Sequence, residues 1–178
     1  RLNYTKDSVL QGQIKQHTCP KGVISDTALQ KIVSNSTTNG ALREILQEED
    51  YELKSYQLLN EFFAAVIEVF KPEWIGMIPK NSRLKHGAGL VAMGFVMEYL
   101  YSNGARIKED FIPGLLTLKD YTSWTSGTWN FSITDIRPWN GIQNTPTDTD
   151  ILTNYLVRSL KKALSCLLYT SDAADERS

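Results

Sequence analysis

Every residue from Ala88 to Met97, inside the stretch Ser82–Tyr101, is apolar or glycine. A helix that is apolar on all sides is usually buried in a protein core. This run of ten residues is too short to cross a bilayer, which needs roughly 20. The pattern therefore predicts a central core helix over Ser82–Tyr101, with Leu90, Met93 and Met97 buried.

Apolar residues at helical spacing predict further helices around this centre. The clearest pattern covers Glu52–Phe70, and we expect this helix to neighbour the central one. Its end is expected just before Pro72, because the residue preceding a proline disfavours helical backbone. Ser25 has the chemistry of an N-cap for the helix that follows it. Three more helices are predicted over Ala41–Leu46, Lys108–Tyr121 and Pro146–Leu164.

The helix that begins near Pro146 carries its own start signal. Proline suits the first helical position, and Thr147 with Asp150 resembles a capping box in which Asp replaces Glu. The two carboxylates of Asp148 and Asp150 are therefore assigned to helix capping rather than to metal binding.

The segment Thr122–Thr145 interrupts the helical pattern. It holds three of the four tryptophans, with Gly127, Pro138 and Gly141 between them. Because glycine and proline mark turns, we predict one ordered, Trp-rich irregular segment in which a short strand pair is one option. The predicted fold class is mainly α: a single helical domain of five or six helices around the buried central helix.

The two ends of the chain have unusual sequences. The residues Cys166–Glu176 resemble the translation of a transposon-based sequencing adapter, so we expect residues 166–178 to be a non-native tail. The first residue is Arg1 rather than Met, and we therefore expect an N-terminal part to be missing. The natural part of this sequence is then residues 1–165.

Composition narrows the class of protein. The chain has 178 residues, of which 42% are hydrophobic and 22% charged, as in a globular domain. The net charge of −1 gives no overall attraction to nucleic acid, so any such binding must come from a local patch. Cys19 is the one cysteine outside the expected tail, and no signal peptide is visible, so we expect a cytoplasmic protein without membrane contact.

The sequence shows no catalytic or metal-binding motif. His17 and His86 stand far apart, and the glycines after His86 do not follow the spacing of a dinucleotide-binding loop. We therefore expect no catalytic residue, no metal site and no cofactor in this portion. Whether the whole protein is an enzyme stays uncertain.

Two clusters have the chemistry of nucleic-acid contacts. Basic residues stand at the start of the central helix, just before its apolar run, where a helix start attracts anions, and the stretch Arg137–Asn144 is rich in residue types that read or stack on nucleobases. A solvated helix start and a loop plugged by its own side chains are the structural alternatives. The candidate nucleic-acid-binding residues are Arg83, Lys85, His86, Arg137, Trp139, Asn140, Gln143 and Asn144.

Several stretches together resemble the C-terminal part of the DGQHR-domain family, which includes the DndB-like DNA sulfur modification proteins. The resembling stretches are Gly22–Leu29, Asn60–Phe63, Pro72–Trp74, His86–Leu90, Thr125–Trp129, Trp139–Pro146 and Asn154–Leu156. The resemblance implies a DNA-associated regulatory protein of DNA phosphorothioate modification or defence islands. The name-giving Asp-Gly-Gln-His-Arg motif is not in this sequence, so residues 1–165 would be the helical C-terminal lobe of a larger protein.

Three functions follow as expectations. The first is this DNA-associated regulatory fragment, with DNA and the protein partners of a modification system as its ligands. The second is a helical scaffold or protein-interaction lobe without nucleic-acid contact. The third is part of an enzyme whose site lies in the missing N-terminal portion.

Overall fold

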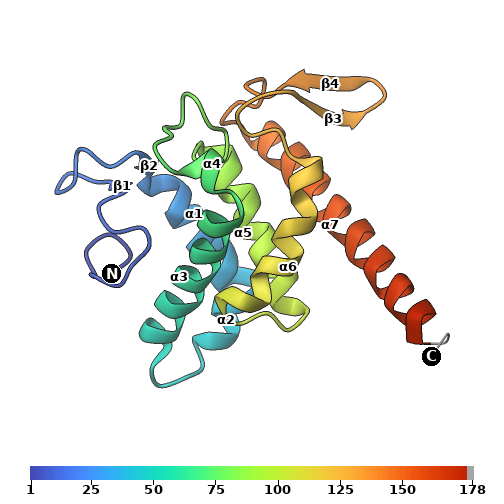
Figure 1. Ribbon diagram of the computed structural model, residues 1–178. Helices are drawn as coiled ribbons and strands as arrows, with labels where there is room; N and C mark the ends of the chain where they lie inside the picture. Colours follow the sequence, from blue (N-terminus) through green and yellow to red (C-terminus); the bar gives the residue numbers. More distant parts are fainter. Residues whose placement is uncertain (176–178) are drawn as a thin grey trace.

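The computed structural model describes the backbone of residues 1–175 and the side chains as far as Leu167. Within this part the chain forms seven α-helices and two small two-stranded sheets (Figure 1), so the fold is mainly α as predicted. The helices are α1 (Asp26–Asn39), α2 (Ala41–Ile45), α3 (Tyr51–Val69), α4 (Lys71–Trp74), α5 (Gly87–Ser102), α6 (Lys108–Leu118) and α7 (Pro146–Asp175). A 3₁₀ turn over Lys119–Tyr121 follows α6.

The helix count exceeds the expected five or six because α4 is a separate turn directly after α3. Phe70 leaves the helical conformation, and the chain restarts at Lys71 with Pro72 in the first turn. Proline is tolerated there because the first turn has no intrahelical partner for its missing N–H.

Helix α5 is the centre of the core. Leu90, Met93 and Met97 are fully buried at 0% exposure, which confirms the predicted core of the central helix, but the helix begins at Gly87, five residues after the predicted start at Ser82. Its closest helical neighbours are α7 and α1, whereas α3 packs mainly against α6, so the expectation that α3 is the helix next to α5 is wrong. The reason is that the apolar face of α3 meets α6, where the rings of Phe62 and Phe111 lie edge to face with their centroids 5.3 Å apart.

Two glycines of α5 let neighbouring chain segments approach closely. A Cβ atom built on Gly94 would lie 2.9 Å from Cγ1 of Ile32, at the point where α1 meets α5. A Cβ atom on Gly89 would lie 1.9 Å from the carbonyl oxygen of Arg83. Side chains at either position would push these segments apart, which accounts for two residues of low helix propensity in the central helix.

The Trp-rich segment is a β-hairpin followed by a loop. Strand β3 (Thr128–Ser132) pairs antiparallel with β4 (Asp135–Pro138), so the strand pair is present. The indole of Trp129 is fully buried, lies edge-on to Trp124 with ring centroids 5.0 Å apart, and donates to the carbonyl of Trp139 at 3.1 Å. Aromatic contacts of Trp129 and Phe131 with Tyr155 fix the hairpin on α7. Figure 1 shows the hairpin above the beginning of this helix.

Helix α7 begins at Pro146 as predicted, but its cap is Thr145 rather than the pair Thr147 and Asp150. The Thr145 hydroxyl accepts from the backbone N–H of Asp148 at 3.2 Å. Because Pro146 takes the first helical position, the residue before it is the N-cap. The helix continues into the expected tail, where Cys166 and Leu167 are exposed.

The N-terminal residues form loops and a minimal parallel strand pair. Strand β1 (Ile14–Lys15) pairs with β2 (Ile24–Ser25), and the second strand leads directly into α1. The Ser25 side chain accepts from the N–H of Ala28, which confirms the predicted N-cap. This pairing brings the start of α1 close to the segment that precedes α5.

Candidate functional site

The two predicted clusters lie side by side. The Arg83 guanidinium donates to the main-chain carbonyl of Asn140 at 3.0 Å, and its central carbon lies 5.8 Å from the ring centroid of Trp139. The Asn144 side chain lies against the start of α5, where a Cβ atom built on Gly87 would be 2.7 Å from its Oδ1. The structure therefore joins residues that are separated by more than fifty positions in the sequence.

Arg83 is half-buried and holds two loops together. It donates to the carbonyls of Pro79 and Asn140, both at 3.0 Å, and its backbone N–H donates to the carbonyl of Trp124 at 2.9 Å. Its Nε atom is buried and has no hydrogen-bond partner within the described residues. Burial lowers the pKa of Arg83 from its ordinary value.

Lys85 is buried, with 4% of its surface exposed, so it does not belong to a solvated helix start. Its ammonium donates to the main-chain carbonyl of Trp74 at 3.2 Å and lies 5.1 Å from the centroid of the indole ring of the same residue. Burial lowers the pKa of Lys85, because the charged form loses its hydration.

His86 is the residue immediately before α5. Its Nδ1 atom is buried and has no hydrogen-bond partner in the part of the chain that the structure describes. The side chain does not cap the helix that it precedes. Burial, and then the charge of Arg83, lower the pKa of His86 from its ordinary value, which favours the neutral imidazole.

A polar cavity of about 330 Å³ opens beside these residues, between the starts of α1 and α5. Three of the eight candidate residues line it: Lys85, His86 and Asn144. Its other lining residues are Lys15, Val23, Ser25, Asp26, Thr27, Pro79 and Gly87. Sequence reasoning missed Lys15 and the residues that begin α1, because only the tertiary fold brings them to this place.

Arg137 serves a different purpose from the one predicted. It forms a bidentate pair with Asp135, at 2.8 and 3.0 Å, and a further hydrogen bond with Asp148 at 2.9 Å. These bonds raise the pKa of Arg137 above its ordinary value and link the hairpin to the start of α7. Because its guanidinium is paired with the carboxylates of Asp135 and Asp148, Arg137 is not available to a ligand, and we place it outside the candidate site.

The loop after Arg137 presents its amide side chains to solvent. Asn140, Gln143 and Asn144 are exposed, and within the described residues none of their side chains forms a hydrogen bond. The structural alternative requires these amides to turn inward and bond the loop backbone, and that expectation is wrong. The loop is held instead by its main chain, for example by the Gln143 N–H donating to Asp148 at 2.8 Å.

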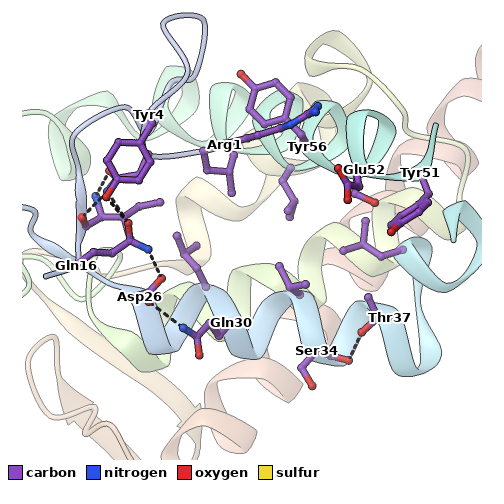
Figure 2. A pocket seen from close by; sticks show the side chains of 18 of the residues that line it. Arg1, Tyr4, Gln16, Asp26, Gln30, Ser34, Thr37, Tyr51, Glu52 and Tyr56 are labelled. Atoms are coloured by element: carbon purple, nitrogen blue, oxygen red, sulfur yellow. Dashed lines mark hydrogen bonds between the residues drawn. The ribbon is translucent and has the colours of Figure 1, made fainter. Parts of the chain in front are cut away.

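A larger cavity of about 730 Å³ lies between α1, α3 and the N-terminal residues (Figure 2). Its floor is mainly apolar, and Figure 2 shows Gln16, Asp26 and Gln30 joined by hydrogen bonds along one wall. The apolar lining residues include Leu29, Val33, Leu42, Leu46 and Leu59. The sequence did not predict this cavity, because apolar residues at helical spacing have the same pattern whether they pack in the core or line a cavity.

Within the described residues, no group of three or more His, Cys, Asp or Glu side chains is placed to hold a metal ion. In the same part of the chain, no helix combines the length and apolar character that crossing a membrane requires. Comparison with protein-family models, curated proteins and solved structures finds no match for this chain.

Proposed function

We propose that this chain is a DNA-associated helical lobe of a regulatory protein resembling the DndB-like members of the DGQHR-domain family, linked to DNA phosphorothioate modification or defence. The observation that carries the proposal is the contact of Arg83 with Trp139 and Asn140, which joins the basic start of α5 to the amide-rich loop. Basic groups position a phosphate backbone, while amide and aromatic groups beside them contact bases.

Electrostatics support this assignment. Lys54, Lys108 and Arg137 each pair with a carboxylate. Like most other basic residues of the described chain, Arg83 and Lys85 form no ion pair; what distinguishes them is that both donate to main-chain carbonyls beside the amide-rich loop and the polar cavity. Their positive charge is therefore not neutralised locally, which gives a chain of nearly zero net charge a site that attracts phosphate.

Fluorescence anisotropy with labelled duplex and single-stranded DNA, at low and moderate salt, tests the proposal. The Arg83→Gln variant should bind all sequences more weakly, and the slope of log affinity against log salt should fall by about one. Asn140→Ala should instead change the preference between sequences.

Arg43 provides a matched control. Its guanidinium also donates to a main-chain carbonyl, that of Thr38, but it lies on α2 at the far end of the bundle from α4 (Figure 1). Arg43→Gln should leave DNA affinity unchanged. A folded full-length chain that binds neither DNA at low salt would end the proposal.

A protein-interaction lobe is the second candidate, and the apolar cavity beside α3 favours it. Val33, Leu46 and Tyr51 line this cavity and are each at least 36% exposed. Exposed apolar surface of this kind is typical of contact sites. Under this function, substitutions of Val33 and Leu46 impair partner binding, and Arg83→Gln has no effect on it.

A further inference from the structure

The polar cavity beside α5 contains a buried positive charge without a counter-ion. The Lys85 ammonium makes one hydrogen bond, to the carbonyl of Trp74, and its remaining donors have no partner among the described residues. Charges buried in proteins are normally paired, because removing an ion from water without compensation is costly. The residue is 4% exposed, and its other close contact is with the Trp74 ring, whose centroid lies 5.1 Å from the ammonium and which carries no negative charge.

The helix start that borders the same cavity is also uncompensated. Helix α5 begins at Gly87, and no side chain caps its first turn. The first N–H groups of a helix have no intrahelical acceptor, and they carry the positive end of the helix dipole. The buried Nδ1 atom of His86, likewise without a partner among the described residues, adds a third polar group at this wall.

The carboxylate nearest in the lining, that of Asp26, is already engaged. Its Oδ1 accepts from the Gln16 amide at 3.1 Å and its Oδ2 accepts from the Gln30 amide at 2.8 Å. Figure 2 shows both bonds along the wall of the larger, apolar cavity. Asp26 forms no ion pair with Lys85, so the ammonium is available to an incoming anion.

We propose that this cavity is a phosphate site, in which Lys85 supplies the charge and the N–H groups at the start of α5 supply directional donors. Its volume of about 330 Å³ leaves room for a phosphate group together with water. The ligand is either free phosphate or the terminal phosphate of a DNA strand. Only the second source rests on the proposed DNA function.

The test is a ¹H–¹⁵N NMR titration of the full chain with inorganic phosphate, at ionic strength held constant with sodium chloride. We expect saturable shifts of the amide signals of Gly87, Ala88 and Gly89. Lys85→Met keeps an apolar stem in the buried position and should weaken phosphate binding about tenfold or more. Lys80→Met, at an exposed position in the preceding loop, should bind phosphate as the unaltered chain does.

A second titration separates the two sources. An oligonucleotide with a 5′-phosphate, compared with the same oligonucleotide ending in a 5′-hydroxyl, should shift these amides only when the phosphate is present. If inorganic phosphate binds and neither oligonucleotide does, the cavity is a free-phosphate site and the DNA function fails. If DNA binds but phosphate does not shift these amides, the cavity proposal fails and the DNA function stands. Phosphate-induced amide shifts that are the same in Lys85→Met and in the unaltered chain would also overturn the cavity proposal.

Discussion

Arg83 donates a 3.0 Å hydrogen bond to the main-chain carbonyl of Asn140, a residue 57 positions further along the chain. Because the acceptor is backbone, the contact does not depend on the side chain at position 140. The guanidinium thereby connects the segment before α5 to the loop after the hairpin, and the position of Trp139 depends on it.

The first prediction concerns this contact. Arg83→Met removes its hydrogen bonds to the carbonyls of Pro79 and Asn140 and should cost about 1–3 kcal/mol of unfolding free energy. Quenching of tryptophan fluorescence by acrylamide should rise, because Trp139 loses its contact with Arg83. Trp139 is half-buried, whereas Trp74, Trp124 and Trp129 are at most 2% exposed and should contribute little to the change. Arg43→Met is the control, and equal quenching in both variants would contradict the prediction.

The second prediction concerns the glycines of α5. Gly89→Ala places a Cβ atom 1.9 Å from a main-chain oxygen, which cannot turn away as a side chain does, and should cost about 3 kcal/mol. Gly94→Ala meets side-chain atoms of Ile32 at 2.9 Å or more, a less severe overlap than the 1.9 Å at Gly89, and the gain in helix propensity of about 1 kcal/mol should offset part of its cost. Urea unfolding compares them, and a Gly94→Ala variant at least as destabilised as Gly89→Ala would contradict the ranking.

The third prediction concerns acid stability. Burial raises the pKa of Asp148, but hydrogen bonds from Arg137 and from the Gln143 N–H outweigh it, so the pKa lies below the ordinary 3.8. A depressed carboxylate pKa stabilises the fold fully above the ordinary value, and this stability is lost as the pH falls through the folded-state pKa. Asp148→Asn should therefore cost about 1.5–3 kcal/mol at pH 7 and reduce the loss of stability below pH ~4.

Asp150→Asn is the matched control for this experiment, since Asp150 is an exposed acid two residues further along α7. Asp150→Asn removes a negative charge near the same helix start, but it breaks no hydrogen bond to Arg137 or Gln143. Stability curves measured from pH 7 to pH 2 that coincide for both variants would refute the assignment.

The fourth prediction concerns the end of the chain. Ser165, Cys166 and Leu167 are exposed, so truncation after Ser165 should change the melting temperature by less than about 3 °C. Truncation after Tyr155 removes Leu156 and Leu160, both fully buried, and should unfold the protein. Circular dichroism melting of the two truncations measures the difference, and a large loss on the shorter deletion would count against a non-native tail.

The central helix was predictable because its signal is local: a run of ten apolar residues and glycines is stable in water only when it is buried in the core. The N-cap at Ser25 was predictable for the same reason, since a cap depends on its own helix. The cap of α7 was assigned two residues too late, because Thr145, Thr147, Asp148 and Asp150 offer overlapping capping patterns and only the backbone at Pro146 selects one.

The candidate site was predictable only in part. Residue type identified Arg83, Lys85 and His86, but a lysine beside an apolar run looks solvated, and its burial comes from Trp74, which lies eleven residues earlier. Charge pairing is equally non-local: nothing near Arg137 in the sequence reveals that Asp148 will meet it. Cavities are voids between elements, so neither one had a sequence signal.

The glycine contact between α1 and α5 fixes more than the distance between two helices. Both helices begin at the wall of the polar cavity, and their separation is set where Gly94 meets Ile32 without slack. The two helix starts are therefore held at a fixed separation before any anion arrives, and binding should need no movement of α1 against α5.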